Sequence, residues 1–387
     1  MKSLLHKLSY VTRASDWRLS FVPFIMGTVY VYLGWFQIPF TSQTVWLTFL
    51  SLVTTVGFSS LGYFINEYFD KASDAKAGKL NKLAYMPSSA QFGIFIGSLL
   101  LTFFPWIWLP STFFSWCLIT TQVSLFLMYS LPFSRFKEHT YLSLIIDASY
   151  AYVVPLWLSF YTFSLIAGQP GSPLWFHLFS AAVFFVGIRN IVVHQIKDVF
   201  RDARLGLNFL PLRLGVNATR VALHTLLVYE CFFMFLFMVA FVYEKPPFII
   251  LFFFCAVGFM LQVNSIFVAK SENWREGFFA NRIYQYAFPL GALTLLSTTD
   301  LKWLIIVVPL HLLLLFPPSY VSAASDFTCY VFHKLKSALV HVVVTYFRHL
   351  LSMAINYPIY LFFKLIGIDL IKENKTAADV LFGRKKK

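Results

Sequence analysis

The chain has 387 residues, of which 58% are hydrophobic and only 12% are charged, with 31 Lys and Arg against 17 Asp and Glu. Soluble globular proteins carry about 25% charged residues, so this composition excludes a soluble globule and indicates a membrane protein. The net charge of +14 does not indicate nucleic-acid binding, because membrane topology and anionic lipid account for it.

Apolar segments long enough to cross a bilayer, about 17 to 25 residues each, recur along most of the chain. They are continuously apolar rather than alternating, so they predict transmembrane helices and not a β-barrel. We expect about nine or ten spans, at roughly 17–36, 45–65, 92–109, 112–131, 142–166, 175–193, 221–242, 248–268, 283–296 and 301–316.

The loops between these segments alternate between basic and nearly uncharged. The basic ones are the N-terminus and the segments 70–82, 133–140, 197–220 and 270–282. By the positive-inside rule, the basic loops face the cytoplasm. The sequence therefore predicts a multi-pass integral membrane protein whose acidic stretches, described next, open on the cytoplasmic side.

The first acidic stretch, NEYFDKASD, begins at Asn66, directly after an apolar run. Asn66, Asp70 and Asp74 are spaced by four residues and drift only about 80° around a helix, so they form one stripe of oxygen atoms. Such a stripe at the end of a membrane helix is unexpected in a chain so poor in acids.

A second acidic stretch, HQIKDVFRD, repeats this spacing with His194, Asp198 and Asp202. The two stretches predict an internal pseudo-repeat. Closely spaced carboxylates at a membrane boundary repel one another and indicate a bound cation, for which Mg²⁺ is the natural candidate because it prefers hard oxygen ligands. In the alternative interpretation, each Asp pairs with a neighbouring Lys or Arg in a solvated loop.

Beyond about residue 320, basic residues are spread through an apolar sequence that ends in FGRKKK. This pattern suits helices that lie in the headgroup layer and contact anionic lipid. We therefore expect two parts, a transmembrane domain at 1–320 and a basic, apolar, membrane-associated extension at 321–387.

Between the acidic stretches the chain reads YSLPFSRFK, from Tyr129 to Lys137, and the second stretch is followed by FLPLRLG. With these motifs the chain resembles the UbiA superfamily of membrane prenyltransferases over about its first 320 residues. The resemblance implies a bundle of about nine transmembrane helices around a central cavity. It also implies that Mg²⁺, held by the two acidic motifs, binds the diphosphate of a polyprenyl donor.

The resemblance assigns roles to individual residues. Glu67 stands where the family usually has Asp in the first motif. Arg135 and Lys137 would contact the diphosphate, Tyr129 would line the site, and Asp70 and Asp198 would be central to catalysis. The implied metal ligands are Asn66, Glu67, Asp70, Asp74, Asp198 and Asp202.

Five further residues are weaker candidates for substrate binding. Arg18, Lys197 and Arg204 would add positive charge, or would serve only as topology and headgroup residues. His194 is either the counterpart of Asn66 or a buried polar residue that a neighbouring helix satisfies. Asp147 is an acid within the fifth span, where ionisable residues are functional by default, and it would orient a cation or the acceptor.

The expected activity is transfer of an isoprenyl group to an aromatic or other lipophilic acceptor, with release of diphosphate. Within the same superfamily, the alternatives are phosphoribosyl-type transfer to a polyprenyl phosphate and terpene cyclisation. From other classes, the alternatives are a cation transporter, since intramembrane acids also mark ion paths, and a membrane scaffold without enzymatic activity.

Overall fold

The computed structural model describes residues 14–17, 21–76, 78, 80–169, 171–204, 209–253, 255, 284, 288–303 and 305. All of these belong to the first of two units into which the chain divides, Met1–Tyr320. The second unit, Val321–Lys387, lies outside the described residues, as do the interfacial helices predicted there. The predicted domain boundary therefore stays a prediction.

The described residues are helical and include no strand, which confirms the all-α prediction for this part of the chain. The longer elements, and the short ones that connect them, are α2 (Ala14–Trp17), α3 (Phe21–Trp35), α4 (Ser42–Lys76), η1 (Leu83–Tyr85), α5 (Ser88–Phe103), η2 (Phe104–Ile107), α6 (Phe113–Ser130), η3 (Phe136–Glu138), α7 (Leu142–Ala148), η4 (Ser149–Val153), α8 (Val154–Ile166), α9 (Leu174–Arg204), α10 (Leu210–Leu214), α11 (Val216–Glu244), η5 (Pro246–Phe248) and α14 (Phe288–Thr299).

Six helical segments in the described part of the chain are long and apolar enough to cross a membrane. They are Ser42–Lys76, Ser88–Ile107, Phe113–Ser130, Leu142–Ile166, Leu174–Phe200 and Val216–Glu244, and α3 and α14 are shorter apolar helices. The predicted runs at 248–268 and 301–316 lie mostly outside the described residues. The expected count of about nine or ten spans therefore stays a prediction.

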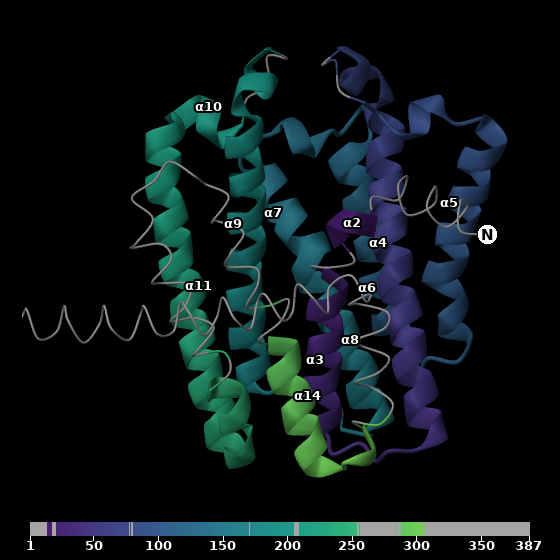
Figure 1. Ribbon diagram of the computed structural model, residues 1–387, viewed down its shortest axis with the longest axis vertical. Helices are drawn as coiled ribbons and strands as arrows, with labels where there is room; N and C mark the ends of the chain where they lie inside the picture. Colours follow the sequence, from purple (N-terminus) through teal and green to yellow (C-terminus); the bar gives the residue numbers. More distant parts are fainter. Residues whose placement is uncertain are drawn as a thin grey trace, which may run out of the picture. The chain divides into compact units, whose positions relative to one another are not determined.

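The long helices form a bundle around α3, in which every residue after Phe21 is buried (Figure 1). Exposed apolar side chains cover the outer helices, including Phe92 and Leu100 on α5 and Val228 and Phe235 on α11. An apolar outer surface of this kind would be costly in water and suits contact with lipid tails. The bundle therefore has the surface expected of a membrane protein.

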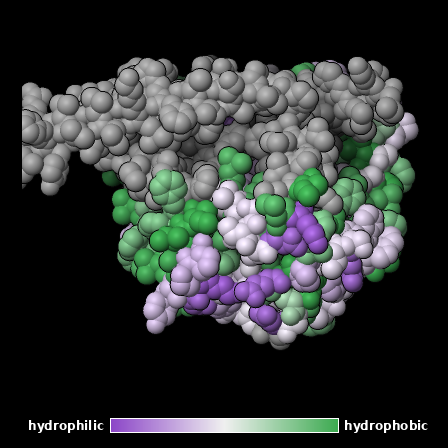
Figure 2. All heavy atoms as spheres, turned by 60° about the horizontal axis from the view of Figure 1, so that its bottom comes forward, coloured by the Kyte–Doolittle hydropathy of each residue, from purple (hydrophilic) through white to green (hydrophobic). Residues whose placement is uncertain are grey.

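Both acid-bearing helices, α4 and α9, end at the upper end of the bundle in Figure 1, where α10 also lies. The opposite end holds the turns after α3, α11 and α14. Figure 2 brings that end forward and shows hydrophilic residues gathered there between hydrophobic flanks. Polar ends and apolar sides are the arrangement that a bilayer imposes.

A π-helical turn, η4, interrupts the predicted fifth span between α7 and α8. Pro155, near the start of α8, has no N–H group to donate to the carbonyl one turn earlier, so the regular hydrogen-bond ladder cannot pass through it. Turns of this kind are frequent at functional sites. Here the turn carries Tyr150 and Tyr152.

Candidate functional site

The first acidic stretch forms the last two and a half turns of α4, and its three carboxylates are buried. The exposed fractions of Glu67, Asp70 and Asp74 are 3%, 8% and 7%. Buried carboxylates need partners, since the charged form loses its hydration. The alternative interpretation is therefore wrong for the first stretch in its solvated loop, since these acids are buried on α4, although Asp70 does pair with basic residues.

Two basic side chains from the loop after α6 contact Asp70. The Lys137 ammonium donates a hydrogen bond to Asp70 Oδ1, and Arg135 Nη2 lies 3.7 Å from the same oxygen. Burial lowers the pKa of Lys137, and the neighbouring Asp70 opposes that shift. The structure thus brings together three predicted site residues from two distant motifs.

Arg135 is held in an uncommon backbone conformation. Its φ of 37° lies in the left-handed region, which costs free energy for a residue with a side chain. Its Nε also lies 3.1 Å from Glu138 Oε1, so the guanidinium contacts two carboxylates. This double contact keeps the guanidinium at the mouth of the site.

Asn81, which sequence reasoning did not select, holds the end of the first stretch in place. Its Nδ2 donates to Asp74 Oδ2 at 3.0 Å and to the Glu67 carbonyl at 2.8 Å. Its Oδ1 accepts from the N–H groups of Leu83 and Ala84. Sequence reasoning had no signal for it, because the spacing rule for a helix does not reach across the turn between Asp74 and Asn81.

Asn66 lies one turn before Asp70 on α4, and Tyr129 lies in the last turn of α6. Ser130 Oγ is 3.5 Å from Asn66 Oδ1, which links α6 to α4. The Tyr129 ring packs edge-on against Tyr150, with ring centroids 5.4 Å apart. These contacts extend the polar site from the acid cluster toward the π-helical turn.

The second acidic stretch lies at the end of α9. Asp198 is partly buried, whereas Lys197 and His194 are exposed. The exposure of His194 argues against its interpretation as a buried polar residue. Asp202 and Arg204 belong to α9, but their side chains lie outside the described residues, as does Arg18.

Asp147 is an intramembrane acid with a partner. Tyr150 donates its hydroxyl hydrogen to Asp147 Oδ1, and Gln122 on α6 donates to the Tyr150 carbonyl at 2.7 Å. Sequence reasoning treated this acid as lone, although Tyr150, three residues later, is a neighbour on the helix surface. The pair lies beside Tyr129 and therefore belongs to the same polar region.

The structure contains a buried ion pair between Arg189 and Glu230 that the sequence analysis did not predict. Arg189 Nε donates to Glu230 Oε2 at 2.6 Å, and the exposed fraction of each residue is 3%. Glu230 interrupts the predicted span at 221–242 just as Asp147 interrupts its own span. The rule that intramembrane acids are functional by default would therefore have selected Glu230 from the sequence.

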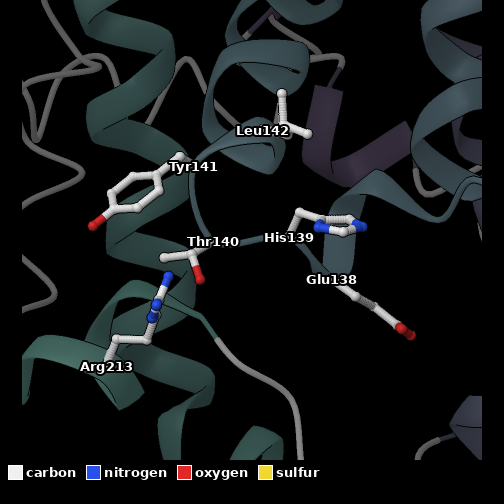
Figure 3. A pocket seen from close by; sticks show the side chains of 6 residues that line it. All are labelled: Glu138, His139, Thr140, Tyr141, Leu142 and Arg213. Carbon is white, nitrogen blue, oxygen red and sulfur yellow. The ribbon is translucent and has the colours of Figure 1, made fainter.

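A small cavity of about 270 Å³ opens beside the site, between the η3 loop and α10. Figure 3 shows Arg213 of α10 reaching toward Thr140 and Tyr141, and its guanidinium carbon lies 5.9 Å from the Tyr141 ring centre. Glu138 and His139 point the other way. The contact places the loop after α9 next to the loop after α6, at the same end of the bundle.

Among the residues that the structure describes, no three His, Cys, Asp or Glu side chains form a ready-made metal cage. Mg²⁺ commonly takes only one or two carboxylates and completes its octahedron with water and substrate phosphate. Asp70 and Asp74, buried one turn apart on α4, meet that requirement. The donor chemistry of the site therefore suits a metal ion that arrives together with a phosphate ligand.

The fold and the site define a multi-pass helical membrane protein with buried acids and paired cations at one end of its bundle. The chain belongs to the UbiA prenyltransferase family, whose model matches residues 20–288. A search of curated proteins finds no matching sequence.

Solved structures of UbiA homologues share the fold. One from Archaeoglobus fulgidus, bound to GPP and Mg²⁺, is 16% identical, with a TM-score of 0.53, over 75% of this chain and 99% of that one. The same homologue bound to DMAPP and Mg²⁺ gives 15% identity, a TM-score of 0.52 and the same coverage. An apo homologue from Aeropyrum pernix K1 gives 14% identity and a TM-score of 0.53, over 70% of this chain and 97% of that one.

Proposed function

We propose that this protein is a Mg²⁺-dependent intramembrane prenyltransferase. It takes a polyprenyl diphosphate as donor, moves the isoprenyl group to an aromatic or other lipophilic acceptor, and releases diphosphate. The observation that carries the proposal is the contact of Asp70 with both Lys137 and Arg135 near the C-terminal end of α4. Acids for a metal and cations for a diphosphate are the pair of charges that this chemistry needs.

In the absence of substrate, the two cations neutralise Asp70. When the donor binds, Lys137 and Arg135 turn from the carboxylate of Asp70 to the diphosphate. Asp70, Asp74 and Asp198 would then hold the metal, with Asn66, Glu67 and Asp202 as further candidate ligands. Bound Mg²⁺ would neutralise the diphosphate and so make it a better leaving group. The exchange keeps Asp70 paired with a cation before and after binding.

Bond cleavage then depends on how well the site stabilises the departing diphosphate. As the allylic carbon–oxygen bond breaks, Lys137 and Arg135 donate hydrogen bonds to the oxygens that gain charge. Tyr129 and Tyr150, which pack together below the acids, present ring edges and faces to the allylic carbon and exclude water from it. Asp147 orients the acceptor, and its carboxylate takes the proton that the acceptor loses.

Arg18, His194, Lys197 and Arg204 remain candidates for substrate contacts at the rim of this site. Lys197 and His194 are exposed on α9, where they can meet the outer oxygens of a diphosphate. We place the site on the cytoplasmic side, because the loops that surround it are the basic ones. The prenyl tail would then lie between helices, in contact with lipid.

The test is Mg²⁺-dependent diphosphate release by the purified protein from a panel of prenyl diphosphates of different lengths. Wild type would be compared with Asp70→Asn and Asp198→Asn, each with and without candidate aromatic acceptors, and products would be weighed by mass spectrometry. Each substitution should lower the rate roughly 10²- to 10³-fold, the loss typical when one group that stabilises transition-state charge is removed.

Other outcomes would identify the alternatives. A folded wild-type protein that releases no diphosphate from any donor contradicts the proposal. Product formed from a polyprenyl phosphate and a phosphoribosyl diphosphate would indicate phosphoribosyl transfer, and a cyclic product without an acceptor would indicate cyclisation. Ion flux that depends on Asp70 and Asp198, with no diphosphate release, would indicate a cation transporter.

A further inference from the structure

Five polar side chains form a connected network in the interior of the bundle, away from the acid motifs. We name this network the polar brace, and its members are Tyr152, Arg189, Asn190, Glu230 and Tyr284. Its centre is the ion pair between Arg189 on α9 and Glu230 on α11, in which Nε and Nη2 lie 2.6 and 3.4 Å from the two carboxylate oxygens. This is the bidentate geometry that arginine and a carboxylate favour.

The brace reaches other segments at both ends. Tyr284 donates to Glu230 Oε1 at 2.8 Å. On the other side, Arg189 Nη1 lies 3.3 Å from Asn190 Oδ1, and Asn190 Nδ2 donates to the Tyr152 hydroxyl at 2.6 Å. The contacts therefore join α9 to α11, to residue 284 and to the π-helical turn η4.

Stability alone does not explain this arrangement. Removing two charges from water costs several kcal/mol per ion, and both residues lie in segments that qualify as membrane spans. Well-packed apolar residues of similar size are usually as stabilising as a buried ion pair, or more so. What a buried pair adds over apolar packing is a single preferred geometry.

One member of the brace, Asn190, lies toward the face of α9 that carries the second acid motif, whereas Arg189 lies about 180° around the helix from Asp198. Asn190, His194, Asp198 and Asp202 follow one another at intervals of four residues, so each is rotated only about 40° from the one before. Asn190 lies eight residues, or about 12 Å along the helix axis, from Asp198. A rotation of α9 at Asn190 therefore moves Asp198 as well.

The partner of Asn190 is also connected to the helix of the first acid motif. Tyr152 lies two residues from Tyr150, whose carbonyl accepts from Gln122 on α6. The same helix contacts α4 through Ser130 and Asn66. The π-helical turn thus stands between α6, which is linked to the first motif, and α9, which carries the second.

The backbones of α9 and α7 lie close together beside the contact between Asn190 and Tyr152. A Cβ added to Gly187 would lie 2.7 Å from both Cα and Cβ of Ala148 and 3.1 Å from the Tyr152 ring. The glycine therefore lets α9 approach α7 and η4 one turn before Asn190. At this separation the Asn190 amide reaches the Tyr152 hydroxyl directly.

We infer that the polar brace positions α9 relative to α4, and so sets the distance and rotation at which the two acid motifs face each other. The Arg189–Glu230 pair orients Asn190, and Asn190 binds the turn that is tied to the first motif. These five side chains are positioning residues that act through Asp198. The inference rests on the proposed function, because it assumes that both motifs hold the same Mg²⁺–diphosphate group.

The test separates positioning from stability by means of Arg189→Met, Glu230→Met and the double variant. Each single variant leaves a buried charge without its partner and should lower the Tm in detergent, whereas the double variant should recover a Tm close to that of wild type. The second readout is the rise in Tm on titration with Mg²⁺ at saturating inorganic diphosphate. The double variant should need at least about ten-fold more Mg²⁺ than wild type for half of the full rise.

Tyr152→Phe removes one hydroxyl and no charge, so it tests the same inference if the double variant does not fold. Its Mg²⁺ requirement should also rise, by a smaller factor. Tyr161→Phe is the matched control, since Tyr161 bonds Thr112 elsewhere in the bundle, and its Mg²⁺ requirement should equal that of wild type.

A wild-type Mg²⁺ requirement in the double variant, or in Tyr152→Phe where the double variant is unfolded, overturns the inference and leaves the proposed function intact. A wild-type protein whose Tm does not respond to Mg²⁺ and diphosphate together overturns the proposed function, and the inference with it.

Discussion

At the scale of single residues, the burial of Asp70 depends on cations that the chain supplies 65 and 67 residues later, at Arg135 and Lys137. A carboxylate buried without them would be protonated or would force its helix end to open. The site is therefore held together by its own charges before any ligand arrives. This balance makes the effect of individual substitutions predictable.

Replacing Lys137 with Met should lower the rate of diphosphate release roughly 10²- to 10³-fold, because one donor to the leaving group is lost. Lys137→Arg should retain part of the rate, since it keeps the charge but alters the geometry. The rates would be measured at saturating Mg²⁺ and donor. Lys302→Met, at an exposed position on the opposite end of the bundle, is the control, and equal losses in both Met variants would refute the role of Lys137.

Replacing Asn81 with Ala should destabilise the protein by about 1–3 kcal/mol, because it leaves buried backbone groups and Asp74 without their partner. The Mg²⁺ requirement should rise as well, since Asp74 would no longer be held in place. Thermal unfolding and a Mg²⁺ titration would measure the two effects. Asn217→Ala on exposed α11 surface should change neither, and an Asn81 variant as stable as this control would contradict the prediction.

The two motif stripes could be predicted from the sequence, because a helical period of 3.6 converts a spacing of four into a shared face. Asn81 could not, because it lies in a turn beyond the helix that carries the stripe, and the pairing of Arg189 with Glu230 could not, because the two residues lie far apart along the chain. Asn81 reaches back across a turn to Asp74, and Arg189 meets an acid that is 41 residues away. Such contacts depend on which helices become neighbours, and hydropathy carries no such information.

At the scale of helices, the bundle uses glycine where two backbones meet closely. A Cβ on Gly57 of α4 would lie 2.4 Å from the Thr102 backbone nitrogen of α5, and Gly187 plays the same part between α9 and α7. Small residues at such crossings are typical of membrane helices, whose association relies on close packing. The crossings fix how far apart the motif-bearing helices stand.

Gly187→Ala should therefore destabilise the protein by about 1–3 kcal/mol, because the added methyl group overlaps the Ala148 backbone and the helices must separate. Thermal unfolding in detergent would measure the loss. Gly93→Ala on α5 is the matched control, since no described atom lies within 4 Å of its added methyl group. That variant should be neutral or slightly stabilised, and a Gly187 variant that behaves like it would refute the close crossing.

At the scale of the whole molecule, the sequence correctly predicted a helical membrane bundle, since continuous apolar runs have no other way to satisfy their backbone in lipid. It also predicted that five basic segments lie on one side, of which the N-terminus and 270–282 lie outside the described residues. In the structure, Arg213 packs on Tyr141 and Lys137 pairs with Asp70, which brings the loops at 70–82, 133–140 and 197–220 to the same end. The π-helical turn was not foreseen, because hydropathy does not register a local change in hydrogen-bond pattern.

The orientation of this end can be tested with two exposed serines, Ser89 at the start of α5 and Ser111 in the loop between η2 and α6. In a chain whose four native cysteines are replaced, Ser89→Cys should react with a membrane-impermeant thiol reagent only from the cytoplasmic side, because it lies at the basic end. Ser111→Cys should react only from the other side. The reverse pattern would invert the predicted topology.

The shared end of α4 and α9 has a consequence for the traffic of reactants. Under the proposed function, a diphosphate formed there can leave directly into water and never carries its charge through the apolar core. The prenylated product, by contrast, can escape sideways between helices and stay dissolved in the bilayer. A site at the boundary thus separates its two products by solubility alone, because one enters the three-dimensional aqueous phase and the other stays in the two-dimensional bilayer. Since the two products no longer share a phase, they cannot easily meet again to reverse the reaction.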